Sequence, residues 1–367
     1  MIMNLPKPRD CIQALGAYPL VPPLEGDASQ ILNLANNEYW RSPPQEIGKA
    51  VAEALQSMNV YPETSAGFLR KEIGDYFGLD ADRIVCSNGS SELISMLCRV
   101  YCDAEDEIIV GPYSYLYFRT SSQIVDARIV KAGSHVGPLN IQDILDKVSD
   151  KTKIVFLDNP QNPIGTYQAC EFTETLRQKL PDHILLVLDS AYAEFVDAED
   201  YCPGQALVDS YANVVMLRTF SKIFGLAGIR IGWSYACDEI TDLIHRVRQP
   251  NNVSGLSLAA ASAAMKFCRP VSEIRSENTI ARQALVKVME QAGLQTYPSV
   301  TNFVLSKLPE SYDGDGNYLT AQLRQQKILI RPMAGYGLPD HVRITVPNIE
   351  DIPRLGAALS AELMGSN

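Results

Sequence analysis

Short apolar runs rich in β-branched residues alternate with longer helical stretches through the middle of the chain. The runs lie at residues 83–86, 107–110, 127–130, 153–157, 184–188, 214–217 and 230–233. Several are apolar throughout, which is typical of strands buried on both faces, and alternation with helices is typical of parallel sheets. The pattern therefore predicts an α/β fold in which a mostly parallel seven-stranded sheet is flanked by helices.

The pattern changes on both sides of this region. After residue 250 it becomes helical and then gives strand-like stretches at residues 301–306 and 342–346, which predicts a smaller α+β domain. The first 41 residues are rich in proline and lack periodicity. We therefore expect three parts, which are an N-terminal arm at residues 1–41 that joins the small domain, a large domain at 42–250 and a small domain at 251–367.

The composition is that of an ordinary folded protein. The chain has 367 residues, of which 46% are hydrophobic and 20% charged, so it is long enough for about two domains. Its 43 acidic residues outnumber the 32 basic ones and leave a net charge of −11. This charge repels nucleic acid and anionic membranes, so neither is expected as a partner, and an anionic ligand needs a local cluster of donors.

Cysteine and histidine do not indicate a metal site. The eight cysteines form no Cys-x-x-Cys pair and several lie in apolar runs, so we expect them to be reduced and structural. The four histidines lie far apart, without a second histidine or a cysteine at metal-ligand spacing. The start has no apolar stretch for a signal peptide, and no run of about eighteen apolar residues occurs. We expect a soluble, cytoplasmic protein.

Residues 218–230, RTFSKIFGLAGIR, follow the sixth predicted strand and contain the first candidate for chemistry. Lys222 comes after Thr219 and Ser221 and is followed by two glycines and by Arg230. A partly buried lysine can form a Schiff base with an aldehyde, and hydroxyls with an arginine can hold a phosphate. An aldehyde and a phosphate together indicate pyridoxal phosphate. Taken alone, a Ser-Lys pair is more often a solvated lysine at a strand end, so the other motifs must decide.

The fifth predicted strand ends in Asp189, and Tyr192 follows three residues later. A carboxylate at the end of an apolar strand can pair with a pyridinium nitrogen and keep it protonated. Tyr192 can then reach the phenolic oxygen of the same ring. The alternative for Asp189 alone is a helix N-cap.

Three further turns follow predicted strands. Asn162 lies in DNPQNPIG, residues 158–165, where two prolines stiffen the loop that would present its amide. Ser90 and Ser91 open a predicted helix, where free N–H groups favour an anion. Tyr115 lies in a tyrosine-rich segment and can cover a planar cofactor. The alternatives are an ordinary turn, simple N-capping and a core or interface cluster, respectively.

Together these segments resemble the fold type I pyridoxal-phosphate aminotransferases, and within them the histidinol-phosphate aminotransferase group. The lysine segment at residues 218–230 is the most specific match, and the motifs occur in the family's order along nearly the whole chain. The resemblance implies pyridoxal 5′-phosphate as the cofactor and implies catalytic roles for Lys222, Asp189 and Tyr192. It implies that the cofactor is bound by Ser90, Ser91, Tyr115, Asn162, Asp189, Tyr192, Thr219, Ser221, Lys222 and Arg230.

The resemblance also implies residues outside these turns. Tyr61 is similar to the tyrosine that reaches the phosphate of the neighbouring subunit, which makes the expected active unit a homodimer with shared sites. Arg331 and Arg343 resemble the arginines that bind the substrate anion, and Tyr18 is assigned to the substrate side as well.

Three functions remain open from the sequence. The first is a transaminase that moves an amino group from an L-amino acid, with glutamate as the expected donor, to a keto acid or a phosphorylated ketone. The second is a decarboxylase of an amino-acid phosphate on the same scaffold, since the orientation of the substrate decides which bond at Cα breaks. The third is a binding protein without activity, which the retained lysine, aspartate, asparagine and arginine disfavour.

Overall fold

The structure is a computed structural model that describes residues 6–17, 22, 27 and 30–365. All seven predicted strands form one sheet with the order β2-β8-β7-β6-β5-β3-β4. β8 runs antiparallel to β2 and β7, and the other pairs are parallel. The strands are β2 (Ile84–Ser87), β3 (Glu107–Val110), β4 (Arg128–Lys131), β5 (Thr152–Asp158), β6 (Leu185–Asp189), β7 (Val214–Thr219) and β8 (Gly232–Tyr235). The predicted α/β sheet is therefore confirmed.

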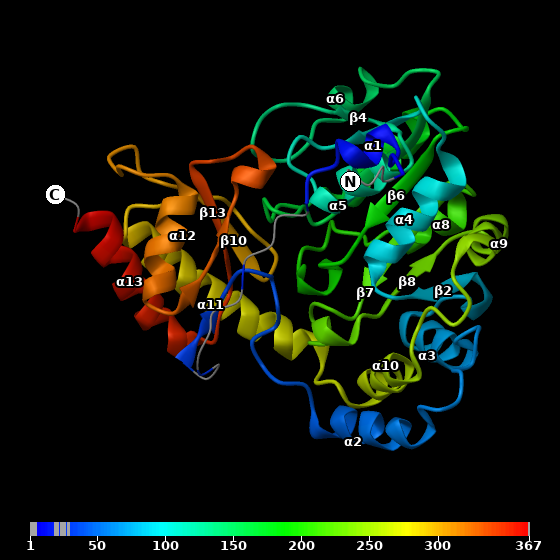
Figure 1. Cartoon of the computed structure of the whole chain (residues 1–367), viewed down its shortest axis with the longest axis horizontal. Helices are drawn as coiled ribbons and strands as arrows, with labels where there is room; N and C mark the ends of the chain where they lie inside the picture. The colour runs from blue at the N-terminus through cyan, green and yellow to red at the C-terminus, as the bar shows by residue number, and fades with distance from the viewer. Residues whose placement is uncertain (1–5, 18–21, 23–26, 28–29, 366–367) are drawn as a thin grey trace, which may run out of the picture.

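Helices cover both faces of this sheet, because alternate residues of each buried strand point to opposite sides. Ile108 packs in one core cluster and Ile109 in the other. The first face is covered by α4 (Ser90–Tyr101), α5 (Leu116–Ile124) and α9 (Asp238–Val247). The second face is covered by α2 (Gln45–Ala54), α3 (Gly67–Phe77), α6 (Ile141–Leu145), α7 (Cys170–Lys179), α8 (Gln205–Ser210) and α10 (Gly255–Phe267). Figure 1 shows this layered arrangement.

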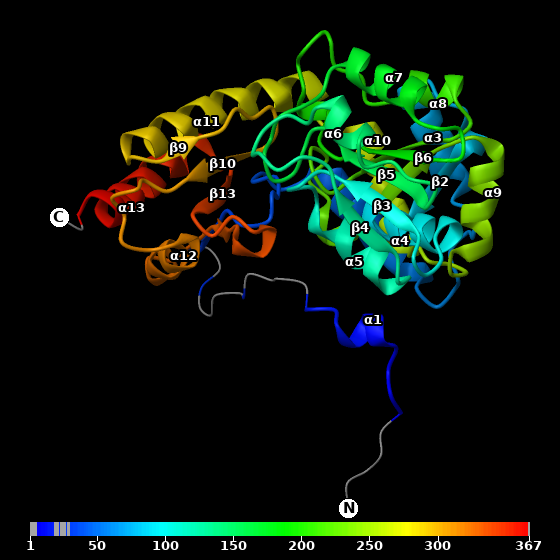
Figure 2. The ribbon, with the colours of Figure 1, turned by 90° about the horizontal axis from the view of Figure 1, so that it is seen from above.

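A second, antiparallel sheet has the order β12-β13-β10-β9 and its own apolar core. Figure 2 shows this sheet and the helices packed with it to one side of the seven-stranded sheet. These elements are β9 (Gln295–Thr296), β10 (Phe303–Lys307), β12 (Arg331–Pro332), β13 (His341–Thr345), α11 (Val271–Gln291), α12 (Gly316–Gln325) and α13 (Ile352–Met364). The strand-like stretches expected near residues 301–306 and 342–346 thus form β10 and β13.

The described residues of the first part of the chain include α1 (Asp10–Gln13) and β1 (Leu32–Asn33). β1 pairs in parallel with β11 (Ile328–Leu329) in a separate two-stranded sheet, which ties this segment to the strand just before β12. Throughout the described part of the chain, no helix combines the length and the apolar character that a membrane span requires.

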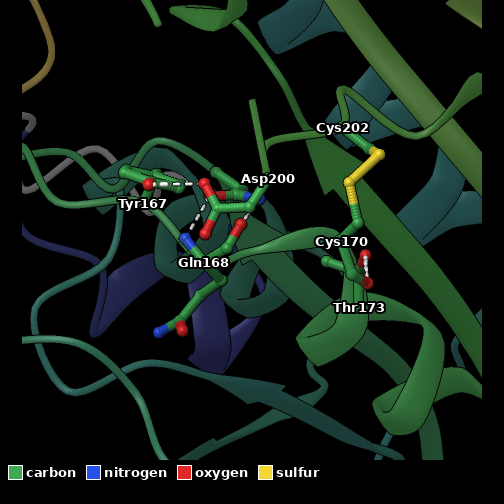
Figure 3. Close-up of a disulfide and its surroundings, with 7 residues drawn as sticks. Tyr167, Gln168, Cys170, Thr173, Asp200 and Cys202 are labelled. Atoms are coloured by element: carbon green, nitrogen blue, oxygen red, sulfur yellow. Dashed lines mark hydrogen bonds between the residues drawn. A yellow bond between two sulfur atoms is a disulfide. The ribbon is translucent and has the colours of Figure 1, made fainter. Parts of the chain in front are cut away.

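One expectation about the cysteines is wrong. Cys170, the first residue of α7, forms a disulfide with Cys202, and their Cα atoms lie 5.1 Å apart (Figure 3). The two residues are separated by 32 positions, so no short sequence motif identifies them as a disulfide pair, and the fold brings them together. The backbone N–H of Cys170 also donates to the carbonyl of Asp200 at 2.7 Å, and Tyr167 donates to the Asp200 carboxylate at 2.7 Å. The other six cysteines are free.

Candidate active site

A cavity of about 350 Å³ opens where the carboxyl ends of the central strands meet the smaller sheet. Ligands of open α/β sheets bind at this edge. Twelve of the predicted residues line the cavity, namely Ser90, Ser91, Tyr115, Asn162, Asp189, Tyr192, Thr219, Ser221, Lys222, Arg230, Arg331 and Arg343. They lie in seven strands or in the segments that directly follow these strands, so the fold collects residues from Ser90 to Arg343 in one place.

Lys222 lies three residues after the end of β7 and is partly buried. Its Nζ atom donates to the backbone carbonyls of Asn36 and Asn37 at 3.3 and 3.4 Å. Burial, reinforced by the positive charge of Arg343, lowers the pKa of Lys222 to about 8. About a tenth of the amine is therefore neutral at pH 7, far more than for an ordinary lysine, and this is the form that attacks an aldehyde or accepts a proton.

Asp189 is the last residue of β6 and is buried. Its Oδ1 atom accepts a hydrogen bond from the backbone N–H of Ala191 at 3.2 Å. Burial, followed by the neighbouring charge of Asp158, raises the pKa of Asp189 to about 7. A carboxylate held in this way gains from a cationic partner such as a pyridinium nitrogen.

Tyr192 lies on the same side of the cavity, and its ring centroid is 5.4 Å from the Nζ atom of Lys222. Its hydroxyl accepts a hydrogen bond from the side-chain amide of Asn37 at 2.8 Å. Burial raises the pKa of Tyr192 to about 12, so the phenol is protonated at neutral pH.

A cluster of donors lines the cavity around the start of α4. Gly89 precedes this helix with φ of 81°, and a Cβ atom placed on it would lie 2.5 Å from Nη2 of Arg230. Arg230 donates through Nη1 to the Ser221 hydroxyl at 3.4 Å, and the N–H of Ser221 donates to the Thr219 hydroxyl at 3.1 Å. With Ser90 at the first turn of the helix, these groups suit a phosphate.

Tyr115 and Asn162 also line the cavity. The Tyr115 hydroxyl lies 3.2 Å from the hydroxyl of Ser91. The Asn162 Oδ1 atom accepts from Nη1 of Arg343 at 2.5 Å, so the amide nitrogen of Asn162 is directed away from Arg343. Asn162 therefore retains a donor for a phenolic oxygen.

The two predicted substrate arginines lie side by side. Arg331 of β12 and Arg343 of β13 are Cα partners in the antiparallel ladder, and both are buried. Arg343 also donates through Nη2 to the carbonyl of Ala35 at 3.0 Å, while its Nε atom is buried without a hydrogen-bond partner among the described residues. A buried guanidinium with an unused donor can bind a carboxylate or a phosphate.

This donor set fits pyridoxal phosphate. The cavity offers an amine with a lowered pKa for the aldehyde, a buried carboxylate for the ring nitrogen, and an amide with a phenol for the phenolic oxygen. A side chain at position 89 would clash with the guanidinium of Arg230. With glycine there, the space between Arg230 and the start of α4 can accept a phosphate.

Comparison with known proteins supports the same assignment. Residues 29–359 match the family described as aminotransferase class I and II. The chain belongs to this family. It is a pyridoxal-phosphate-dependent aminotransferase.

Relatives and solved structures agree with this aminotransferase assignment. The chain is 37% identical to histidinol-phosphate aminotransferase of Granulibacter bethesdensis, covering 98% of this chain and 96% of that protein. It is also 37% identical to the same enzyme of Paramagnetospirillum magneticum, covering 99% and 100%. Its fold is similar to that of the Sinorhizobium meliloti histidinol-phosphate aminotransferase in complex with pyridoxal-5′-phosphate, with a TM-score of 0.87, 24% identity and 100% of both chains covered.

Sequence reasoning missed several residues of the aminotransferase cavity. Asn37, Glu38, Asp158 and Tyr336 line it as well. Asn37 comes from a segment without periodicity and has φ of 56°, a conformation that asparagine adopts more readily than most residues. Asp158 is the first residue of the DNPQNPIG loop and directly follows an apolar run. This position at the end of a predicted strand could have identified it as a site residue.

Among the predicted residues that the structure describes, Tyr61 does not line this cavity. Tyr61 lies on the surface of the single chain with 84% of its area exposed. Tyr18 lies outside the described residues.

Proposed function

We propose that this aminotransferase moves an amino group between glutamate and a phosphorylated ketone, with histidinol phosphate as the aminated partner. The observation that supports it most directly is the pair Arg331 and Arg343, two buried cations that face one cavity from adjacent strands. Such a pair suits substrates with an anion near the reacting carbon, which is the α-carboxylate in glutamate and the phosphate in histidinol phosphate, and it can also bind the second carboxylate of glutamate. The two relatives at 37% identity carry the name histidinol-phosphate aminotransferase.

When bound, the cofactor supplies an aldehyde carbon for the amino group and a ring that accepts electrons from the bond that breaks at Cα. Lys222 holds the cofactor in the resting enzyme and then moves a proton from the substrate Cα, which its lowered pKa favours. Arg343 and Arg331 hold the substrate anion, so that the Cα–H bond rather than the carboxylate bond is aligned for cleavage.

The remaining residues hold the cofactor in the orientation that this proton transfer needs. Asp189 pairs with the ring nitrogen and keeps it protonated, while Tyr192 and Asn162 donate to the phenolic oxygen. Ser90, Ser91, Thr219, Ser221 and Arg230 bind the phosphate, and Tyr115 covers the ring.

A homodimer is part of the proposal. Large apolar side chains are exposed just after α2, including Leu55 at 45%, Met58 at 76% and Val60 at 65%, and Tyr61 follows directly. Clustered exposed apolar residues of this kind mark an interface, and a second copy of the chain would cover them. In such a dimer Tyr61 of one subunit would reach the phosphate site of the other. A cytoplasmic location, expected from the sequence, belongs to the same proposal.

The decisive experiment is a screen of single half-reactions. The purified holoenzyme is mixed with glutamate, histidinol phosphate, aspartate or phosphothreonine, and the absorbance of the cofactor is followed. Glutamate and histidinol phosphate should each convert the cofactor completely without release of carbon dioxide. Conversion by neither would overturn the substrate assignment, and carbon dioxide released from phosphothreonine would favour the decarboxylase instead.

The arginine pair gives a second test. Arg343→Lys keeps the charge but loses the planar fork, so the apparent affinity should fall about tenfold or more for both glutamate and histidinol phosphate. Arg331→Lys should affect the two partners unequally. If Arg343→Lys leaves the affinity for every active amine unchanged, the substrate anion is held elsewhere.

A further inference from the structure

Asp158 is a second buried carboxylate beside the one assigned to the ring nitrogen. It is the last residue of β5 and the Cα partner of Asp189, the last residue of β6. Each has 4% of its area exposed. One Asp158 oxygen, Oδ1, has no hydrogen-bond partner within the described part of the chain. Burying a carboxylate this way is unfavourable for folding, so a role in the site is the simplest reason to find it here.

The other carboxylate oxygen joins two separate cofactor loops. Oδ2 of Asp158 accepts from the backbone N–H of Tyr115 at 3.1 Å and from that of Asn162 at 2.9 Å. Tyr115 lies between β3 and α5, whereas Asn162 lies in the loop after β5. A single atom therefore sets the backbone position of the residue that covers the ring and of the residue that meets its phenolic oxygen.

Through Asn162 and Tyr115, the hydrogen bonds of Asp158 connect further to a substrate arginine and to the phosphate site. Asn162 accepts from Nη1 of Arg343, and Tyr115 meets the hydroxyl of Ser91 at the start of α4. Hydrogen bonds to an ionised acceptor are shorter and stronger than neutral ones, so a carboxylate can hold both N–H groups in place more firmly than an amide can.

We propose that Asp158 is a positioning residue of this active site, which holds Tyr115 and Asn162 in register for the cofactor through its Oδ2 atom. It acts through these two residues and does not itself touch the reacting atoms. The inference rests on the cofactor roles proposed for Tyr115 and Asn162, and it does not depend on which amine is the substrate.

Burial also affects the state of this carboxyl group. It raises the pKa of Asp158 to about 6, while the hydrogen bond from Asn162 acts in the opposite direction. At neutral pH the group is thus largely ionised and can accept both bonds.

The test measures cofactor binding rather than turnover alone. Asp158→Ala removes the acceptor, and Asp158→Asn keeps an acceptor oxygen without the charge. Glu107→Gln is the matched control, because Glu107 is equally buried at 4% exposure but begins β3 at the opposite edge of the sheet, bonded to Ser149 and Arg128. For each variant we would measure the melting temperature of the cofactor-free protein, the Kd of pyridoxal phosphate by titration, and the visible circular dichroism of the bound cofactor.

Asp158→Ala should raise the Kd at least tenfold and reduce the circular dichroism, and Asp158→Asn should recover most of both, with a Kd about threefold above the parent. Glu107→Gln should change only the melting temperature. A Kd for Asp158→Ala within twofold of the parent would overturn the proposal. Should Asp158→Ala fail to fold, Asp158→Asn decides alone, since a Kd and a circular dichroism equal to those of the parent would also overturn it. A parent that does not bind pyridoxal phosphate would instead count against the proposed function.

Discussion

At the scale of single residues, Lys222 is set apart from the other lysines by its surroundings. Its amine is enclosed beside Tyr192 and two backbone carbonyls, with Arg343 close enough to disfavour its charge. Lys222→Ala should therefore lose the visible absorbance of the covalently held cofactor and lower kcat by about 10²–10⁴ or more. Lys153→Ala, near the start of β5 at the other edge of the sheet, is the control and should keep both. Full multiple turnover by Lys222→Ala without added amine would contradict the role.

Asp189 allows a prediction in which stability and activity move in opposite directions. Its carboxyl group loses its proton near pH 4 in the unfolded chain and near pH 7 in the folded, cofactor-free protein. Between these values the folded state binds more protons, so its stability falls as the pH rises. Asp189→Asn should remove this loss and stabilise the cofactor-free protein at pH 8 by up to about 4 kcal/mol, with little gain at pH 4.

In the holoenzyme the same substitution should be harmful. An uncharged pyridine accepts electrons poorly, so proton abstraction should slow by about 10² or more while the cofactor stays bound. Urea unfolding at pH 4 and 8 and single-turnover kinetics measure the two effects. A rate within twofold of the parent would mean that Asp189 serves only as a cap.

Residues whose chemistry follows a strand could be predicted because parallel strands end at one edge. Lys222, Asp189 and Asn162 were found in this way. Asn37 could not be found, since it reaches Tyr192 from a segment with no periodic pattern and 155 positions away. The contacts of Asp158 depend on which strands are neighbours, and the sequence alone does not give that order.

At the scale of elements, the apolar runs predict strands well because each is buried on both faces. Observed and predicted boundaries differ by one or two residues, as at β8, which begins at Gly232 rather than at residue 230. Arg230 has φ of 57° and turns its side chain toward Ser221 instead of extending the strand. The left-handed backbone at Arg230 thus accounts for the later start of this strand.

The disulfide between Cys170 and Cys202 holds the start of α7 to the segment before α8. A closed loop of 32 residues should contribute about 3 to 4 kcal/mol to the free energy of unfolding. Cys170→Ser, or reductant added to the parent, should remove that contribution in urea unfolding. Cys237→Ser replaces a free cysteine and is the control. Reductant should lower the free energy of unfolding of this variant as much as it lowers that of the parent. A Cys170→Ser variant as stable as the parent under oxidising conditions would show that the bond does not form in solution.

At the scale of the whole molecule, the single chain gathers twelve predicted residues in one cavity but leaves Tyr61 on the surface. Its apolar neighbours Met58 and Val60 are exposed with it. A molecule with a net charge of −11 gains little from long-range attraction to its own copy, so the proposed dimer would depend on this apolar segment. Dimer formation should therefore persist at high salt.

Shared sites can be tested by mixing two impaired variants. Lys222→Ala removes the amine of its own site, and Tyr61→Phe removes the hydroxyl that is proposed to reach the phosphate of the neighbouring site. In a heterodimer both lesions fall in one site and leave the other intact, so activity should recover toward half of the parent's value per dimer. The experiment requires that Tyr61→Phe alone is clearly impaired, and the controls are each variant unmixed and a mixture in which both carry Lys222→Ala. Heterodimers confirmed by mass that show no recovery would mean that each chain completes its own site.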